Sequence, residues 1–560
     1  MQRRGLLLAA TATLLAVSSG YGQSAVPPHQ KVYLEAGNIR SSINTLGNMW
    51  YNTGNNEPEC EYPKGSGKHI GYASGLWVGG KVNDTVVTAA VLYHSNGRRD
   101  YFPGILTAGG TSDTALMQHW NRIWTIRRST IDSFRAVVRS VGTANPTALA
   151  AALTSAGFDD LKAWPAKGSA TILGRANQPL SLPPGRDYAP FVDVDGDGKY
   201  NYLAGDYPKM KGEQMLWTAF NDMADVKTQS GSKGMGLEVH LSAYAYARGT
   251  KADDIQFYEY KVHNYGPNAM DSVRVAIWSD GDLGYYADDY IGFDSGRRIG
   301  YVYNAKTVDG NGAPGHYGAN PPIAGIVLLK AVGDYGRSRV PTGAFSYFSS
   351  NTGGTPHCAT SPGIAPEFYN LMSGTDRCGQ PFLNPITGQA TTTIFSGNPA
   401  NAAEWSECSQ YNPPGDRRFI LSSAPFQMAA GAVAEVAFAL VVSPNAGGCP
   451  SVDISGLQQT ADTAYYLYDH PAYATSVKDL TAFSGIVLSP NPAGAELRIQ
   501  NVPVASPSVR VMDITGKVIL LPTEKRGTEI VFRTATLAPG VYLLQISNGE
   551  ATEIRRFVKE

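Results

Sequence analysis

Acidic residues alternate in a short glycine-rich segment of the sequence. Asp193, Asp195 and Asp197 occupy every second position of DVDGDGKYN, and Gly198 follows the third of them. This spacing is the first half of the calcium-loop pattern D-x-[DN]-x-[DN]-G, in which alternate side chains turn toward one cation and the glycine takes a positive φ. The segment therefore predicts a calcium site. The alternative is an Asp/Gly turn that binds no ion.

The remaining ligands of this loop follow from the same alignment. Lys199 would supply its backbone carbonyl, and Asn201 a side-chain or water-mediated ligand. The twelfth position holds Ala204 in place of the usual bidentate Glu, and Asp206 is the nearest replacement. Prolines and glycines flank the loop where an EF-hand has helices, so we expect a calcium loop between strands. Its expected ligands are Asp193, Asp195, Asp197, Lys199, Asn201 and Asp206.

A second acidic cluster, SDGDLGYYADDYIGFD, ends a strand-like run. Asp280 and Asp282 flank one glycine and can chelate a cation in the same alternating way, and Asp288 or Asp289 could complete the shell from the other side of the turn. Two other interpretations stay open. The acids could be solvated turn residues, or acids between residues 280 and 294 could form the carboxylate pair of a glycoside hydrolase, which needs a separation of about 5 to 10 Å.

Length and composition limit the classes of protein to consider. A chain of 560 residues can form about two to four domains. Its net charge of −1, with 17% charged residues, provides no basic face for nucleic acid. The 31 Tyr, 61 Gly and 35 Pro indicate many short strands joined by tight turns. No apolar run of about 18 residues follows the N-terminal segment, so no later transmembrane segment is expected.

The N-terminal segment has the three regions of a secretory signal peptide. Arg3 and Arg4 precede the apolar run GLLLAATATLLAV, and the small residues of SSGYG follow it. This order of positive, apolar and small residues predicts a signal peptide over residues 1–22. A membrane anchor is disfavoured because the apolar run is short.

Export would place the five cysteines in an oxidising compartment, where disulfides persist. An odd number leaves at least one thiol without an internal partner. Proximity in the sequence suggests two pairs, Cys358 with Cys378 and Cys408 with Cys449, and then leaves Cys60 alone. No C-x-x-C pair is present, so neither a zinc ribbon nor a redox motif is indicated.

Four phrases near the C-terminal end are rich in β-forming residues: SGIVLSPNPAGAELRIQ, SVRVMDITGKVI, TLAPGVYLLQIS and EIRRFVKE. Turn residues separate them, which predicts a small antiparallel β-sandwich over residues 486–560. From Leu488 to Glu560 the phrases also resemble, in order, the motifs of the type A sorting domain of the type IX secretion system of Bacteroidetes. The resemblance implies recognition by the secretion translocon, passage through the outer membrane and removal of the domain by the surface sortase. The implied location is extracellular or at the outer-membrane surface, reached through the periplasm.

The rest of the chain also favours strands. Alternating β-formers and turn residues describe β-sandwich segments on both sides of a stretch, at about residues 113–161, whose apolar spacing is helical. We therefore expect a mainly β protein with a multidomain β-sandwich architecture, a helical insert and a small C-terminal antiparallel β-sandwich. The expected parts are a signal peptide (1–22), an N-terminal β-rich region with the insert (23–165), a central β-sandwich region with the acidic loops (166–480) and the sorting domain (486–560).

Central phrases such as SGLWVGG, FYEYKVHN and GDRRFILSSAPFQMAAG resemble uncharacterised exported cargo proteins that bear such sorting domains. That resemblance implies location and architecture and supplies no catalytic residues. The sequence contains no G-x-S-x-G, H-E-x-x-H or P-loop motif and no dinucleotide fingerprint between a strand and a helix, which favours a binding or structural protein over an enzyme. We expect a calcium-stabilised, secreted or cell-surface protein with a binding or structural role, whose ligand is unknown and could be a glycan or a protein. The alternative is a secreted glycan-active hydrolase that uses acids of the 280–294 cluster.

Overall fold

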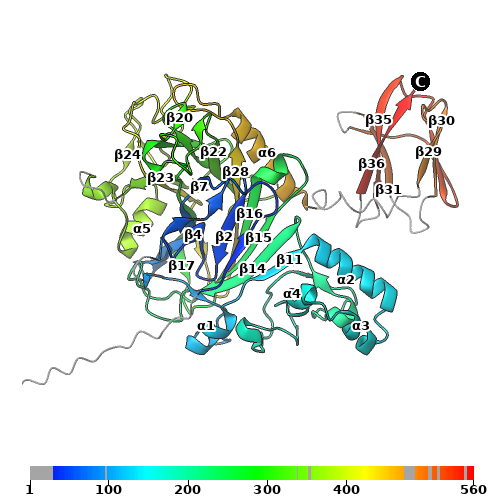
Figure 1. The fold of residues 1–560 in the computed structure, drawn as a ribbon, viewed down its shortest axis with the longest axis horizontal. Helices are drawn as coiled ribbons and strands as arrows, with labels where there is room; N and C mark the ends of the chain where they lie inside the picture. The colour runs from blue at the N-terminus through cyan, green and yellow to red at the C-terminus, as the bar shows by residue number, and fades with distance from the viewer. Residues whose placement is uncertain are drawn as a thin grey trace, which may run out of the picture.

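The computed structural model describes residues 29–94, 97–336, 338–350, 355–471, 486–501, 508–513, 517–547 and 552–560. Strands predominate in these residues and pair in antiparallel sheets, which confirms the prediction of a mainly β fold (Figure 1). The signal peptide predicted over residues 1–22 lies outside the described residues, as does most of the stretch that joins the large β-sandwich to the sorting domain.

In the described part of the chain, eleven strands form the first large sheet. They are β1 (Lys31–Leu34), β2 (Arg40–Asn44), β3 (Asn48–Met49), β6 (Cys60–Glu61), β7 (His69–Gly71), β8 (Ala73–Val82), β9 (Thr85–Ala89), β17 (Met270–Asp280), β23 (Ala344–Ser349), β26 (Arg417–Ser422) and β27 (Phe426–Met428). Their order across the sheet is β23-β26-β17-β8-β3-β2-β6-β7, and β1, β27 and β9 pair with β2, β17 and β8.

Nine described strands form the second large sheet. They are β10 (Phe102–Pro103), β11 (Trp124–Arg127), β14 (Gln214–Asn221), β15 (Leu237–Ala245), β16 (Ile255–Asn264), β18 (Asp289–Asp294), β19 (Ile299–Asn304), β22 (Ile323–Lys330) and β28 (Val433–Ser443). Their order is β10-β14-β15-β16-β28-β22-β19-β18, and β11 pairs with β14.

The main core lies between these two sheets. Alternate residues of β15, among them Val239 and Leu241, pack in one hydrophobic cluster with Leu76 and Val78 of the first sheet. Strand side chains point alternately to opposite faces, so the residues between them face outward. The regions that the sequence analysis divides at residue 165 share both sheets. For example, β8 pairs with β17 along most of its length.

Helices cover the outer faces of the sandwich (Figure 1). They are α1 (Thr114–Trp120), α2 (Arg128–Val141), α3 (Pro146–Ala152), α4 (Asp159–Lys162), α5 (Ala365–Met372) and α6 (Ser455–Asp469). Residues of α2, α3, α4 and α6 share a second hydrophobic cluster with the outward side chains of the second sheet, such as Trp217 and Phe257. On the first sheet, Phe368 of α5 packs edge-on against Trp77, which stacks on Trp278.

The helical insert differs from the sequence prediction between α1 and α2. The helical spacing of Trp120, Ile123 and Trp124 predicts helical structure here, but the chain forms β11 from Trp124 onward and pairs it with β14. Asn121 ends the first helix, and its side-chain Oδ1 accepts hydrogen bonds from Gln30 and Thr45 of the N-terminal strand region. These long-range contacts override the local helical pattern.

Small two-stranded sheets form in addition to the two large sheets. They are β4–β5 (Tyr51–Asn52 and Glu57–Pro58), β12–β13 (Phe191–Val192 and Tyr207–Pro208), β20–β21 (Val308–Asp309 and Gly318–Ala319) and β24–β25 (Phe382–Leu383 and Ala390–Thr391). Disulfides join Cys358 to Cys378 and Cys408 to Cys449, and Cys60 is a buried free thiol, as proximity predicts.

The C-terminal part forms its own small sandwich. Its strands are β29 (Val487–Ser489), β30 (Glu496–Gln500), β31 (Ser508–Asp513), β32 (Val518–Ile519), β33 (Thr523–Arg526), β34 (Glu529–Arg533), β35 (Gly540–Ser547) and β36 (Thr552–Lys559). They form two sheets, β29-β30-β34-β33 and β32-β31-β35-β36. Leu497, Ile499, Leu544 and Phe557 contribute to a separate core, so the predicted C-terminal antiparallel β-sandwich is present.

Candidate metal centre and ligand groove

The alternating Asp segment is the loop of the β12–β13 hairpin. Phe191 pairs with Pro208 and Val192 with Tyr207, so the hairpin brings the two ends of the loop together. Tyr200 anchors the loop from below, because its buried ring contacts Phe191 edge-on and its hydroxyl donates to the Leu161 carbonyl of α4. The helical insert therefore fixes the position of the loop on the sandwich.

Three carboxylates converge in this loop. One side-chain oxygen each of Asp193, Asp195 and Asp197 lies within 4.8 Å of the others. Asp193 also accepts hydrogen bonds from the backbone N–H groups of Gly196 and Gly198, both at 2.8 Å. These glycines have φ of 77°, the left-handed conformation that favours glycine. The turns of the loop thus hold three exposed acidic side chains close to one point.

The other predicted ligands of the loop have structural hydrogen bonds. Asp206 is fully buried and accepts from the backbone N–H groups of Val194 and Asn201, both at 2.8 Å, so it clamps the two ends of the loop. Burial raises the pKa of this carboxyl. The Asn201 side chain accepts from Leu203 N–H, and the Lys199 backbone N–H donates to Asp197. The converging group consists of Asp193, Asp195 and Asp197, and Asp206 lies outside it.

Replacing Asp206 is expected to destabilise the loop. The Asp206→Ala variant loses two hydrogen bonds to a carboxylate, and we expect the free energy of unfolding to fall by about 1–3 kcal/mol. Urea unfolding followed by tryptophan fluorescence measures this, since all eight Trp residues precede the sorting domain. Asp132→Ala, at an exposed position of α2, is the control and should change stability by at most about 0.5 kcal/mol. Equal unfolding midpoints for the two variants would contradict the clamp.

The second acidic cluster has a different membership from the predicted one. One carboxylate oxygen each of Asp280, Asp282 and Asp416 lies within 4.8 Å of the others. Asp280 ends β17, and Asp416 directly precedes β26, which pairs with β17 through Asp280 and Arg418. Sequence reasoning missed Asp416 because only this strand pairing brings it to the other two.

Asp288 and Asp289, which the sequence analysis groups with Asp280 and Asp282, have other partners. Asp288 accepts a hydrogen bond from Gly310 N–H at 3.0 Å, and Asp289 accepts from Leu283 N–H at 3.0 Å. Both bonds fix the backbone of the connection between β17 and the strands that follow. Burial is the main cause that raises the pKa values of both carboxyls.

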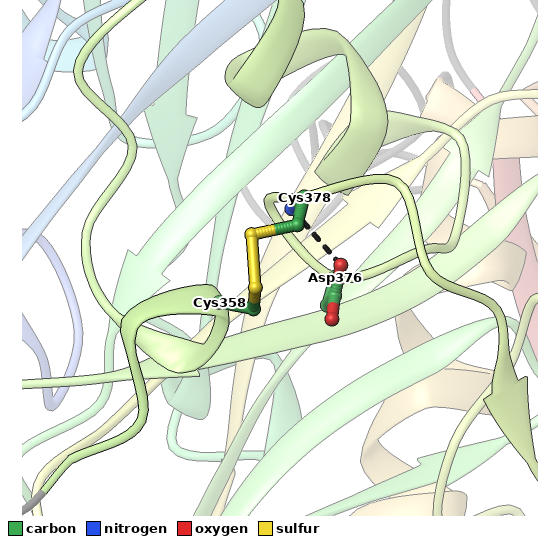
Figure 2. Close-up of side chains that lie close together, drawn as sticks. All are labelled: Cys358, Asp376 and Cys378. Atoms are coloured by element: carbon green, nitrogen blue, oxygen red, sulfur yellow. Dashed lines mark hydrogen bonds between the residues drawn. A yellow bond between two sulfur atoms is a disulfide. The ribbon is translucent and has the colours of Figure 1, made fainter.

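A third group of potential ligands consists of Cys358, Asp376 and Cys378. Figure 2 shows the two sulfurs joined in a disulfide, with the Asp376 carboxylate accepting the backbone N–H of Cys378. A disulfide has no thiolate to offer, and a thiolate is the form of cysteine that binds a metal. This group therefore stabilises its loop and is not a metal centre.

A cavity of about 590 Å³ lies on the outer face of the second sheet. Its floor includes outward side chains of β14, β15 and β16, and its wall includes residues on both sides of the β12–β13 hairpin. The residues that line the cavity include Lys167, Asp187, Tyr188, Phe191, Lys209, Lys211, Trp217, His240, Tyr244, Glu259 and Lys261. We call this cavity the groove.

A buried carboxylate–imidazole pair lies at the floor of the groove. Glu238 and His240 are two residues apart on β15, and Oε1 of Glu238 lies 2.7 Å from Nε2 of His240. Nδ1 of His240 is buried and has no hydrogen-bond partner. The ring of His263 lies 4.5 Å away, and burial together with His240 lowers the pKa of His263 to about 3. His240 therefore has one ring nitrogen bonded to Glu238 and one without a partner, and its ring lies beside aromatic side chains.

Comparison with known families identifies one part of the chain. Residues 488–560 match the family described as secretion system C-terminal sorting domain. These residues are a type IX secretion sorting domain. The sorting domain implies interaction with the type IX secretion machinery, export, and a secreted or cell-surface location. Across the described ranges, none of the helices combines the length and hydropathy that a membrane span needs.

Other comparisons add little about the large sandwich. Among curated proteins, no match to this chain was found. One similar solved structure is a polysaccharide lyase, with 9% sequence identity and a TM-score of 0.18. The similarity covers 57% of this chain and 34% of that chain, so the chain spans about a third of the lyase. A likeness at this level carries no argument about fold or activity.

Proposed function

We propose that this type IX cargo is a calcium-stabilised binding protein, in which calcium held by the hairpin loop orders one wall of a glycan-binding groove. The observation that carries the proposal is the convergence of Asp193, Asp195 and Asp197 on the hairpin that lines the groove. Sorting by the C-terminal domain would deliver this binding module to the cell surface or the medium.

Calcium fits the loop by charge and by ligand type. Three carboxylates this close repel one another unless a cation or protons compensate them. Calcium takes six to eight oxygen ligands from carboxylates, backbone carbonyls and waters, and it accepts flexible geometry. The exposed loop leaves room for water ligands beside Asp193, Asp195 and Asp197. Lys199 would add its backbone carbonyl, and Asn201 would act through a water.

The hairpin connects the loop to the groove. Phe191 belongs to β12, and Lys209 and Lys211 follow directly after β13; all three line the groove. A cation bound by the loop would restrict the motion of β12 directly, and that of β13 through the Asp206 hydrogen bonds and the pairing of the two strands. Binding of calcium would therefore fix the wall before a ligand enters, which lowers the entropy that the ligand must offset.

The lining of the groove favours a glycan. The volume of the groove, about 590 Å³, is in the range of sites for small ligands, about 300–1,000 Å³. Trp217, Tyr188 and Tyr244 give the groove an aromatic lining beside the ring of His240. Aromatic faces combined with a few fixed polar groups suit a sugar ring, which is apolar on its faces and polar at its edge.

The charged residues around the groove favour an acidic glycan over a neutral one. The lysines of the lining outnumber its acids; the charged lining residues are Lys167, Lys209, Lys211, Lys261, Asp187 and Glu259. Lys211 forms an ion pair with Glu259 at 2.6 Å. Glu259 also accepts a hydrogen bond from the Tyr244 hydroxyl. Lys167 pairs with Asp187 and Lys261 with Glu435, so within the described residues Lys209 is the lining lysine left to attract a carboxylate or sulfate group on a sugar chain.

Calcium is expected to raise the thermal stability of the full chain through Asp195. A ligand that binds only the folded state adds about 2.7 kcal/mol at 100 times its dissociation constant. We expect a higher unfolding midpoint in excess calcium than in chelator, and a smaller rise in Asp195→Ala. Asp132→Ala should keep the full rise, because that side chain is exposed on α2 and is not one of the converging carboxylates. Equal calcium effects in Asp195→Ala and the wild type would reject the loop as a calcium site.

The hydrolase alternative has one supporting observation at the second cluster. Burial raises the pKa of Asp280 to about 6 and that of Asp282 well above its usual value, so this pair can hold a proton near neutral pH, as a general acid must. A hydrolase predicts release of reducing ends from a glycan, and loss of that release in Asp282→Asn. The binding protein predicts saturable glycan binding without turnover in both forms.

A further inference from the structure

The geometry points to a second cation site, built by Asp280, Asp282 and Asp416, that binds a hard divalent cation independently of the hairpin loop. These residues come from the end of β17, the residues just after it and the segment before β26. Their convergence within 4.8 Å depends on the pairing of the two strands. We call this group the strand-end site.

Buried oxygens without hydrogen-bond donors are the main observation. Asp280 is fully buried; its Oδ2 accepts a hydrogen bond from the Tyr93 hydroxyl, and its Oδ1 is buried without any partner. Oδ1 of Asp282 is likewise buried and unpartnered. An unpaired buried carboxylate oxygen is costly, and the great majority of buried polar atoms have a partner. A bound cation would supply the missing partner to both oxygens.

Charge balance leads to the same conclusion. Arg418 is the cation beside the group, with Nη2 at 3.4 Å from Asp280 and Nη1 at 2.7 Å from Asp416. One guanidinium compensates one of three carboxylates, so two negative charges remain when all three are ionised. Buried charges are normally paired or coordinate a metal. A divalent cation restores neutrality.

The ligand set selects the class of cation. All three donors are carboxylate oxygens, which suit calcium, magnesium or manganese and not the softer metals. Asp280 and Arg418 face each other in the register of paired strands, and Tyr93 packs edge-on against Trp278 at 5.1 Å. The strand-end site is therefore held by the sheet and its aromatic packing, whereas the first site lies in an exposed loop.

Terbium luminescence tests this site in the full chain. Terbium replaces calcium at oxygen sites and emits when a nearby excited tryptophan transfers energy to it; Trp278 lies two residues before Asp280. We expect titratable emission, displaced by calcium, in the Asp195→Ala background, where the loop site is disabled. Adding Asp416→Asn to this background should weaken terbium binding at least tenfold. Adding Asp282→Asn instead should have the same effect, and both residues are half-buried. An unchanged tryptophan spectrum establishes that each variant is folded.

One control variant and two contrary outcomes test the assignment of the strand-end site. Asp288→Asn in the same background should leave terbium binding unchanged, because Asp288 bonds to Gly310 and lies outside the strand-end site. Loss of binding in Asp288→Asn but not in Asp416→Asn would overturn the assignment. Absence of terbium emission in folded Asp195→Ala would overturn it as well. Neither result affects the loop site, which is tested by the difference between the wild type and Asp195→Ala.

Discussion

Deleting residues 488–560 is expected to abolish delivery of the protein to the cell surface and the medium. These residues are the type IX sorting domain, and the secretion machinery recognises its cargo through this domain. The large sandwich has its own two sheets and its own cores, so loss of the C-terminal sandwich should leave it folded. Immunoblots of cell, surface and medium fractions from the native host measure the effect. The shortened chain should remain entirely in the cell fraction.

Two leucines of the sorting domain provide a matched control. Leu544 is fully buried in the core of the small sandwich, whereas Leu520 is 93% exposed. A buried aspartate costs several kcal/mol, so Leu544→Asp should unfold the domain and block export as the deletion does. Leu520→Asp should be exported normally. Export of the deleted chain, or of Leu544→Asp at the wild-type level, would show that another part of the chain carries the sorting signal.

Replacing Arg298 is expected to cause a large loss of stability in the large sandwich. Its guanidinium forms a bidentate ion pair with Asp334, at 3.2 and 3.1 Å, and donates to the Leu329 and Val340 carbonyls. Both side chains are almost fully buried, with 4% and 2% exposed. Arg298→Met would leave the buried Asp334 charge with the more distant Arg339 as its counter-ion, whose Nη1 lies 3.9 Å away. Breaking such a pair costs about 3–5 kcal/mol, measured as the loss in free energy of urea unfolding.

An exposed ion pair at the end of β22 is the control for this prediction. Lys330 pairs with Glu435, and their side chains are 32% and 45% exposed. Exposed pairs contribute about 0–1 kcal/mol, so Lys330→Met should unfold near the wild-type urea concentration. Similar losses in Arg298→Met and Lys330→Met would mean that burial of the Arg298 pair has no energetic consequence.

Local features of the sequence predict local structure well. The alternation of Asp193, Asp195 and Asp197 before Gly198 is enough to predict three converging carboxylates, because neighbouring residues in a turn determine it. The sorting domain is similarly predictable, since its turns and strands follow one another within one short region. The two disulfides also follow from closeness in the sequence.

Features that depend on distant strand pairing could not be predicted. Asp416 reaches Asp280 only because β26 pairs with β17, and the segment around Asp416 has no metal-binding pattern of its own. The groove has the same origin, since the hairpin and β14 to β16 form it together. Trp124 shows the opposite case, in which a helical pattern was present but pairing with β14 produced a strand. Tertiary contacts determine the secondary structure of such segments, and these contacts cannot be inferred from a single sequence.

Hydrogen exchange of the full chain, with calcium and with chelator, tests most directly whether calcium orders the groove wall. We expect slower exchange in calcium for backbone amides of residues 191–211, which include the loop and Lys209 to Lys211. The protection should disappear in Asp195→Ala, and residues 529–547 of the sorting domain should exchange equally in both conditions. Equal exchange of residues 191–211 with calcium and with chelator would contradict the account, because the loop would then bind no calcium or would not stabilise the wall.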